Sequence, residues 1–401
     1  MEKFGDLDIA FLGSYIGEAL KDKLMKKRSK INFADEHWQK LFIDGLSKNG
    51  IDEITFYSVP FIESFKKNNI FKIKYTETIR NNICYKQIPF INLNYIKIFS
   101  RYKNIKQYLR SWCKKKTERK KILLIYSLHS SFIRLIKTIK KKFPQIVVVV
   151  IILDLPEFMN LERKKSFIYK TLKKIDRKVI AENLLYADHY VLLTEKMIEK
   201  LPYHSYTVIN GMIEQEDVSL ISANQEDNKF EVVYTGSLYE KFGVKKLVDS
   251  MKFISADNVK LIICGWGELE EYIRKAANED QRIIFKGNID LQDAIEVQRN
   301  ASILINPRPN EGEFVKYSFP SKMFEYIKTG KPILCFKLDC FQDEYDEIFN
   351  YIEEYNEKSI AKSILNVVYN YKRYKEKSSK IIGLHKFINI YQVNRLLEDI
   401  C

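Results

Sequence analysis

The stretch Asn306–Phe336, NPRPNEGEFVKYSFPSKMFEYIKTGKPILCF, determines the predicted fold of its part of the chain. An apolar run, Ile303–Ile305, leads into a loop with two prolines, and the helical pattern Lys322–Lys328 follows. Pro320 suits the first turn of that helix, and Gly330 suits the position just beyond its end. A second apolar run closes the stretch. The pattern therefore predicts a strand, a loop, a helix and another strand.

The beginning of that predicted helix is expected to bind an anion. A helix that starts just past a strand presents unpaired backbone N–H groups and a partial positive charge. Three cations in the same stretch, Arg308, Lys316 and Lys322, suit a diphosphate. Glu325, one turn into the helix, supplies a carboxylate that suits the hydroxyl groups of a ribose. The residues thus predict a site for a nucleotide-linked anion.

The same stretch resembles the donor site of GT-B glycosyltransferases, in particular the retaining family 4 enzymes of bacterial surface-polysaccharide assembly. The similar segment reads NPR…KYSFPSK…EY…GKP. The resemblance implies that the loop before the helix binds the donor through Ser318, Phe319, Pro320 and Ser321. SFPSKMFEYI by itself also fits an ordinary amphipathic helix behind a turn.

One position departs from the family pattern. The family's donor motif has two glutamates separated by seven residues; the second falls on Glu325, but Tyr317 stands eight positions earlier. The resemblance leaves three candidates for contact with the donor sugar ring, namely Lys316, Tyr317 and Glu313.

The start of the second half carries a weaker form of the same resemblance. A predicted strand ends at Gly236, and in the family the loop that follows has an arginine after the first glycine and a lysine before the second. Here Ser237 takes the arginine position, and Lys241 stands two residues before Gly243. The resemblance implies that Lys241 contacts the donor diphosphate. It also places Asn288, which follows another strand, near the nucleotide base.

The first half alternates apolar runs with helical patterns, which predicts an open parallel sheet. Ligands of such sheets bind beyond the carboxyl ends of the strands. Three loop residues follow predicted strands and are candidates for a cleft there: Gly13, His129 and Asp154. A purely structural role for His129 remains an alternative.

Three other segments of the first half differ in how clearly their sequence indicates a secondary structure. We expect Lys21–Lys30 to form a solvated, charged loop, and residues 60–94 show no clear period. The segment Tyr95–Lys121 is helical in pattern, strongly basic and interleaved with Tyr102, Tyr108 and Trp112. This mixture suits a helix lying on anionic lipid. A solvated lysine-rich face explains it equally well.

The charge of the chain is unevenly distributed. Of 401 residues with a net charge of +15, residues 1–215 hold 41 Lys and Arg against 22 Asp and Glu. The remainder holds 26 against 30. The basic first half indicates an anionic partner, which could be a membrane surface, a lipid-linked diphosphate or nucleic acid. We expect no nucleic acid, because no nucleic-acid-binding module is recognisable.

The apolar segments and the cysteines also indicate where in the cell the protein is expected. No segment reaches the roughly 20 apolar residues of a membrane span, and the first ten residues lack the pattern of a signal peptide. The six cysteines are scattered without CxxC spacing, which favours reduced thiols and no zinc site. We expect a cytoplasmic protein, peripheral at the inner face of the cell membrane.

The predicted fold class is α/β of the GT-B type, with two Rossmann-like domains facing across a cleft. The expected boundaries are 1–210 for an acceptor-binding and membrane-facing domain, 211–228 for a linker, 229–378 for a nucleotide-sugar-binding domain, and 379–401 for a helix that returns to the first domain. The returning helix is implied by the resemblance.

The implied function is transfer of a hexose-type sugar from a nucleoside-diphosphate sugar. The expected nucleoside is uridine, which is usual in the family. The implied acceptor is a polyprenyl-diphosphate-linked saccharide of bacterial surface polysaccharide. Cations and backbone would stabilise the departing diphosphate, and we expect no metal, no other cofactor and retention of configuration. A non-catalytic subunit of the same fold and a sugar-nucleotide 2-epimerase remain alternatives.

Overall fold

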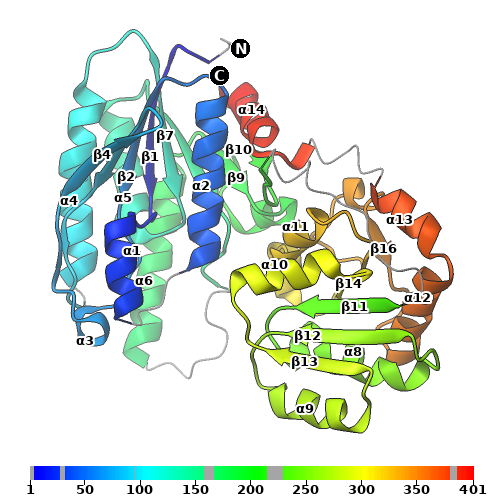
Figure 1. Ribbon diagram of the computed structural model, residues 1–401. Helices are drawn as coiled ribbons and strands as arrows, with labels where there is room; N and C mark the ends of the chain where they lie inside the picture. Colours follow the sequence, from blue (N-terminus) through cyan, green and yellow to red (C-terminus); the bar gives the residue numbers. More distant parts are fainter. Residues whose placement is uncertain (1–3, 28–31, 95, 158–166, 215–228, 380–385) are drawn as a thin grey trace. The chain divides into compact units, whose positions relative to one another are not determined.

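The computed structural model describes residues 4–27, 32–94, 96–157, 167–214, 229–379 and 386–401. The chain forms two compact units. Unit 1 consists of Met1–Met212 and Phe387–Cys401, and unit 2 consists of Ile213–Lys386. Each is a separate α/β body in Figure 1. Most of the predicted linker, residues 215–228, lies outside the described residues.

Unit 1 contains an eight-stranded sheet in the order β10-β9-β8-β7-β1-β2-β5-β4. All neighbours are parallel except β4, which runs antiparallel to β5. The strands are β1 (Leu7–Gly13), β2 (Glu53–Ser58), β4 (Thr76–Arg80), β5 (Ile83–Gln87), β7 (Lys120–Tyr126), β8 (Val147–Ile152), β9 (His189–Leu192) and β10 (Ser205–Val208). A small antiparallel pair, β3 (Lys72–Ile73) and β6 (Phe90–Ile91), lies outside this sheet. The central strands are apolar along their length because helices cover both faces of the sheet.

The helices of unit 1 are α1 (Glu18–Lys26), α2 (Phe33–Lys48), α3 (Phe65–Asn68), α4 (Ile96–Lys114), α5 (Ser130–Lys142), α6 (Phe167–Leu184), the 3₁₀ helix η1 (Glu195–Lys200) and α14 (Asn389–Ile400). The core between α2 and the sheet is aromatic. Phe11 stacks on Phe56 at 5.0 Å between ring centroids, and Trp38 stacks on Phe42 at 5.1 Å. Such pairs add to the free energy gained by burial.

The last helix of the chain completes this core. Val393, Leu396 and Leu397 of α14 are buried with the side chains of α2. The two helices approach closely at Gly45, where a Cβ would lie 2.8 Å from the carbonyl oxygen of Asn389. Asn389 Nδ2 donates to Leu41 O at 3.0 Å and to Asp44 Oδ2 at 2.9 Å. The return of the C-terminal helix to the first unit is therefore confirmed (Figure 1).

Two predictions for unit 1 were wrong. Within Lys21–Lys30, the part that the structure describes belongs to α1 rather than to a loop, because Leu24 is fully buried and fixes an apolar side. Residues 60–94 are more regular than their sequence suggests and hold α3 and β3 to β6. Their strands are short, so no period is visible in the sequence.

The basic helix α4 also differs in detail from the prediction. Trp112 does not face lipid, since it is 5% exposed and its Nε1 donates to Asp8 Oδ1 at 2.7 Å. Arg101 is 2% exposed and lies 4.3 Å above the ring of Phe90. Both side chains hold α4 against the rest of unit 1. No helix among the described residues is long and apolar enough to cross a membrane.

Unit 2 contains a six-stranded parallel sheet in the order β13-β12-β11-β14-β15-β16. Its strands are β11 (Phe230–Thr235), β12 (Val259–Cys264), β13 (Ile283–Gly287), β14 (Ile303–Asn306), β15 (Ile333–Cys335) and β16 (Phe349–Tyr351). Its helices are α8 (Val244–Ser250), α9 (Glu270–Glu279), α10 (Leu291–Asn300), α11 (Lys322–Ile327), α12 (Glu357–Tyr369) and α13 (Tyr371–Ser379), with the 3₁₀ helices η2 (Glu240–Phe242), η3 (Met251–Phe253), η4 (Glu313–Tyr317) and η5 (Asp343–Tyr345). The strand, helix and strand predicted around Asn306–Phe336 are β14, α11 and β15. The order doubles back at β11, next to β14, which is where open parallel sheets bind ligands.

Candidate functional site

The loops beyond β11, β12 and β14 pack backbone against backbone. Gly265 has a φ of 146°, and a Cβ there would lie 1.8 Å from Gly236 O. Gly243 has a φ of 76°, and a Cβ there would lie 1.9 Å from Pro307 O. No other residue type fits either position without moving a main chain. This edge of the sheet is consequently fixed by its glycines.

Arg308 is a buried cation on the loop after β14. It is 6% exposed, its Nη2 donates to Ser318 Oγ at 2.7 Å, and its guanidinium carbon lies 4.9 Å from the centre of the Phe314 ring. Burial lowers the pKa of Arg308 below its usual value. Its buried Nε has no hydrogen-bond partner among the described residues. A fixed, poorly solvated guanidinium with an unused N–H is well suited to an anionic oxygen.

Glu325 lies on α11 beside the end of β11. Its Oε2 accepts from Lys322 Nζ at 2.7 Å and from Gln298 Nε2 at 3.2 Å. The same Gln298 amide donates to Thr235 Oγ1 at 2.8 Å. Glu325 Oε1 accepts no hydrogen bond from the described residues. The carboxylate is thus held from one side and has one oxygen available to a ligand hydroxyl.

The loop before α11 is anchored by an aromatic side chain. Phe319 is 6% exposed and packs on Phe324 at 5.1 Å between ring centroids. The amides of Met323 and Phe324 donate to the carbonyl oxygens of Pro320 and Ser321. These two N–H groups are already used within the segment, so the expectation of unpaired backbone donors at the start of α11 does not hold for them.

The other predicted residues of unit 2 fall into exposed and buried groups. Lys316 and Glu313 are exposed on η4, whereas Tyr317 at its end is 4% exposed and packs into the unit. Lys241 is exposed, with its Nζ 5.5 Å from the centre of the Tyr239 ring.

Two further positions flank the strand ends. Ser237 is half-buried, and its carbonyl oxygen accepts from Tyr234 Oη at 2.9 Å. Asn288 is exposed just after β13. Arg308, Ser318, Lys322 and Glu325 are thus the predicted residues joined by direct hydrogen bonds.

In unit 1, the predicted residues lie at the carboxyl ends of different strands. Gly13 ends β1, and a Cβ there would lie 2.4 Å from Gln39 Oε1, so glycine is required for packing. His129 caps α5, with its Nδ1 2.8 Å from Ser131 Oγ and its ring stacked on Phe61 at 4.7 Å. Burial lowers the pKa of His129 to about 3, which keeps it neutral. Asp154 follows β8 and is exposed.

The loop after β1 is held by two side chains of α2. Ser14 N donates to Gln39 Oε1 at 2.8 Å, and Gln39 Nε2 donates to Ser14 Oγ at 3.0 Å. Ile16 N lies 3.0 Å from both carboxyl oxygens of Glu36. Burial raises the pKa of Glu36 to about 7.

Five residues of these arrangements were not predicted. They are Thr235, Gln298 and Tyr326 in unit 2, where Tyr326 Oη accepts from Thr235 N at 3.0 Å, and Glu36 and Gln39 in unit 1. A signal existed for the last two, because their spacing in α2 places them on the same side as the buried Ile43, seven residues after Glu36 and four after Gln39. Gln298 occupies a buried position of α10 and had no such signal.

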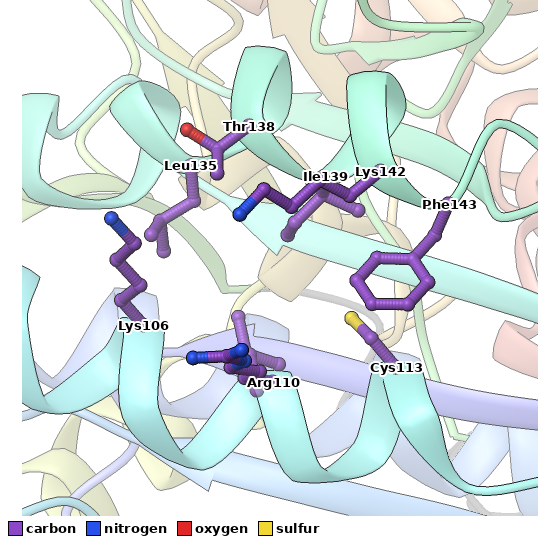
Figure 2. A pocket seen from close by; sticks show the side chains of 9 residues that line it. Lys106, Arg110, Cys113, Leu135, Thr138, Ile139, Lys142 and Phe143 are labelled. Carbon is purple, nitrogen blue, oxygen red and sulfur yellow. The ribbon is translucent and has the colours of Figure 1, made fainter.

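A small cavity separates α4 from α5 on the outside of unit 1 (Figure 2). Its volume is about 60 Å³, and its floor is apolar, with Leu109, Leu135 and Ile139 buried. Three basic side chains line it as well: Lys106, Arg110 and Lys142. Among the described residues, no three His, Cys, Asp or Glu side chains gather as metal ligands would.

A family model matches the part of the chain that contains Arg308 and Glu325. Residues 229–370 match the model of the family described as glycosyl transferases group 1. The search of curated proteins finds no match.

Solved structures resemble the whole chain at low sequence identity. HepE of Anabaena, in complex with UDP, has a TM-score of 0.60 and 12% identity over 98% of this chain and 99% of its own. Sucrose-phosphate synthase from Thermosynechococcus elongatus has a TM-score of 0.61 and 13% identity, with 98% of each chain covered. The lipopolysaccharide outer core galactosyltransferase WaaB has a TM-score of 0.57 and 16% identity, also with 98% of each chain covered. The likeness establishes the GT-B fold with two Rossmann-like units.

Proposed function

We propose that this chain, a glycosyltransferase of GT-B fold with a glycosyl transferases group 1 domain, transfers a hexose-type sugar from a nucleoside-diphosphate sugar. The observation that carries the proposal is that Arg308 and Glu325, on either side of the loop that joins β14 to α11, each have an unused polar group. The buried guanidinium has an unused Nε, and the carboxylate has an unused Oε1. A diphosphate and a ribose diol are the parts of a sugar nucleotide that need such partners.

Negative charge grows on the diphosphate as its bond to the sugar breaks. Arg308 stabilises that charge strongly because it is poorly solvated. We propose that Lys241, Lys316 and Lys322 add further positive charge. These four cations do the work often done by a metal ion, so we propose a metal-independent reaction. By analogy with family 4, the configuration at the sugar is retained.

The donor base is proposed to be uracil. HepE binds UDP and UDP-glucose in two of its structures. Two further candidates for donor contact are the segment Ser318 to Ser321, which precedes α11, and Asn288, which follows the edge strand β13. Tyr317 replaces the family's first glutamate with a buried ring, so Lys316 or Glu313 is left to contact the sugar.

The proposed acceptor is a polyprenyl-diphosphate-linked saccharide in bacterial surface-polysaccharide synthesis. The support is the excess of basic residues in the first half and the surface of α4. Phe99 is 69% exposed near the start of this helix, and Ile96 is 48% exposed. Lys103, Lys106 and Arg110 follow on the exposed side. Apolar and basic side chains together suit the interface of an anionic membrane at the cytoplasmic side.

The donor proposal is tested by measuring heat of binding and thermal stabilisation with UDP, GDP, ADP and CMP, with and without magnesium. We expect UDP alone to stabilise the protein, without metal. Arg308→Gln should weaken UDP binding at least tenfold, and Arg299→Gln, which changes an exposed cation of α10, should not. If folded protein binds none of the four, the non-catalytic subunit becomes the better account.

The membrane proposal is tested by flotation with neutral and anionic liposomes. We expect binding to anionic liposomes only, reduced by salt, because screening weakens surface charges. Phe99→Ser should reduce it several-fold, whereas Tyr369→Ser, a change at an aromatic side chain of unit 2 that is 73% exposed, should leave it intact. Binding that ignores both lipid charge and salt would contradict the proposal.

A further inference from the structure

A second cavity of unit 1 lies between α1 and the edge of the sheet formed by β5 and β4. Its volume is about 210 Å³, many times the roughly 15 Å³ that one water molecule needs. Thr76, Thr78 and Arg80 alternate along β4 and share one face of the sheet. Opposite them on β5 stand Gln87 and Tyr85, in register with Thr76 and Thr78.

The wall formed by the loop after β1 is held in position. Gln39 and Glu36 of α2 bind the backbone of Ser14 and Ile16 on either side of Tyr15. Ser58 Oγ, at the end of β2, donates to Tyr15 O. The Tyr15 ring also lies 5.9 Å from that of Tyr85. The loop is thus tied to α2, β2 and β5, and the cavity is a preformed feature of the fold.

The polar groups that line the cavity have few partners in the protein. The hydroxyls of Tyr15, Tyr85, Thr76 and Thr78 and the guanidinium of Arg80 make no hydrogen bond with any described residue. Burial raises the pKa of Tyr15 and brings that of Tyr85 to about 12, so both phenols keep their protons and can donate. Gln87 donates from Nε2 to Lys74 O, which leaves its amide oxygen as an acceptor.

The lining fits one class of ligand better than others. A lipid chain does not suit walls with this many hydroxyls. A strongly anionic group does not suit them either, because Glu18 of α1 also lines the cavity and offsets the charge of Arg80. A sugar ring matches both features, since it offers many hydroxyls to donors and acceptors and an apolar face to an aromatic ring.

We infer that this cavity binds a pyranose unit of the acceptor saccharide. That the sugar belongs to an acceptor rests on the proposed function. That the cavity binds a sugar rests on the cavity alone. Arg80, Thr76 and Thr78 would bond to the hydroxyl groups of the pyranose, and the rings of Tyr15 and Tyr85 would contact its apolar face. The cavity would therefore select among acceptors by the sugar they carry, independently of the donor residues in unit 2.

The test uses the full chain and a panel of methyl glycosides, observed by saturation-transfer NMR: glucoside, galactoside, N-acetylglucosaminide and glucuronide. We expect at least one to bind. Thr78→Trp, which fills the cavity, and Arg80→Ala should each weaken that binding at least tenfold. Lys86→Ala should not, because Lys86 lies on the other face of the same hairpin, paired with Glu77 at 3.4 Å. Glucoside and glucuronide should lose affinity equally in Arg80→Ala; a larger loss for the glucuronide would contradict a neutral sugar as the occupant.

Two controls separate this inference from the donor proposal. Glu325→Ala should leave glycoside binding unchanged, and UDP binding should be unchanged in Thr78→Trp and Arg80→Ala. Failure of every glycoside to bind to protein that binds UDP would overturn the inference and leave the donor site standing. Glycoside binding that survives Thr78→Trp and is lost in Glu325→Ala would also overturn it.

Discussion

The carboxyl edges of the two sheets are stabilised by different means. In unit 2, the loops beyond β11, β12 and β14 touch through their backbones, and Gly265 and Gly243 make that approach possible. In unit 1, the loop after β1 is held at a distance by side chains, with Gln39 and Glu36 reaching back from α2. The first arrangement tolerates no added atom at its glycines, whereas the second depends on the charge and shape of two side chains.

This difference explains why the loops of unit 2 could be predicted from the sequence more readily than those of unit 1. A backbone contact requires glycine at a set position, so it leaves a pattern that a family shares. A side-chain contact joins residues 20 and 25 positions apart and leaves no local pattern. The family model accordingly matches residues 229–370 and not the first half.

The strongest expected effect is that of Gly265→Ala. The new Cβ would lie 1.8 Å from Gly236 O, and neither backbone can move without disturbing β11 or β12. We expect a loss of about 4 kcal/mol in the stability of unit 2. Hydrogen-exchange mass spectrometry measures it separately for each unit. Gly17→Ala is the control, since nothing lies within 4 Å of a Cβ there, and a comparable loss in that variant would refute the backbone-contact argument.

Glu325→Gln should have the next largest effect, on activity rather than folding. The amide keeps the shape of the side chain but would weaken the proposed bond to a ribose hydroxyl and the pairing with Lys322. We expect kcat/KM for the donor to fall roughly 100-fold, or about 2.7 kcal/mol. Glu296→Gln removes an exposed carboxylate from α10 and should change little. An unchanged rate in Glu325→Gln would remove this residue from the site.

Much of unit 2 was predictable because its chemistry is contiguous in sequence. The strand, helix and strand around Pro320 and Gly330 follow from local rules, and Arg308 and Glu325 belong to the same stretch. Their supports were not predictable. Gln298 bonds both Thr235 and Glu325 only because the fold brings α10, β11 and α11 together.

For unit 1, the sequence indicated the parallel sheet but not the strands β5 and β4 at one side of it. The apolar runs predicted β1, β7 and β8, whereas β4 and β5 are short and partly exposed, so they show no clear alternation. The helix α4 had a pattern that suggested an interface, yet Trp112 faces Asp8 inside the unit. A helical pattern tells which residues share a side, and tertiary contacts decide which side is buried.

Glu36 makes the stability of unit 1 depend on pH in a way that unit 2 does not share. Its pKa is about 7 in the folded chain, against an ordinary value of 4.5, because burial disfavours the charged form. Between these values the unfolded chain releases the proton and the folded chain keeps it, so stability falls as pH rises through this window. Glu36→Gln removes the part of this dependence that Glu36 contributes, whereas Asp154, whose pKa is raised to about 6 by desolvation, keeps its own. We expect the variant to gain about 2 kcal/mol relative to the natural chain between pH 5 and pH 8.

The measurement is urea unfolding at several pH values, followed by hydrogen exchange in each unit. Asp44→Asn, which changes a partly exposed carboxylate of the same helix, serves as the control. A difference between Glu36→Gln and the natural chain that stays constant from pH 5 to pH 8 would show that Glu36 is already charged in the folded state.

The smallest effect expected is that of Asn389→Ala, which tests the connection between the chain's end and unit 1. Asn389 is fully buried and donates to Leu41 O and Asp44 Oδ2, so alanine leaves two acceptors without their donor. We expect unit 1 to lose about 1.5 kcal/mol and the amides of α2 and α14 to exchange faster. Asn394→Ala, on the same helix, breaks no hydrogen bond in the described structure and should be close to neutral. If unit 2 exchanged faster to the same degree, α14 would stabilise both units rather than complete the core of the first.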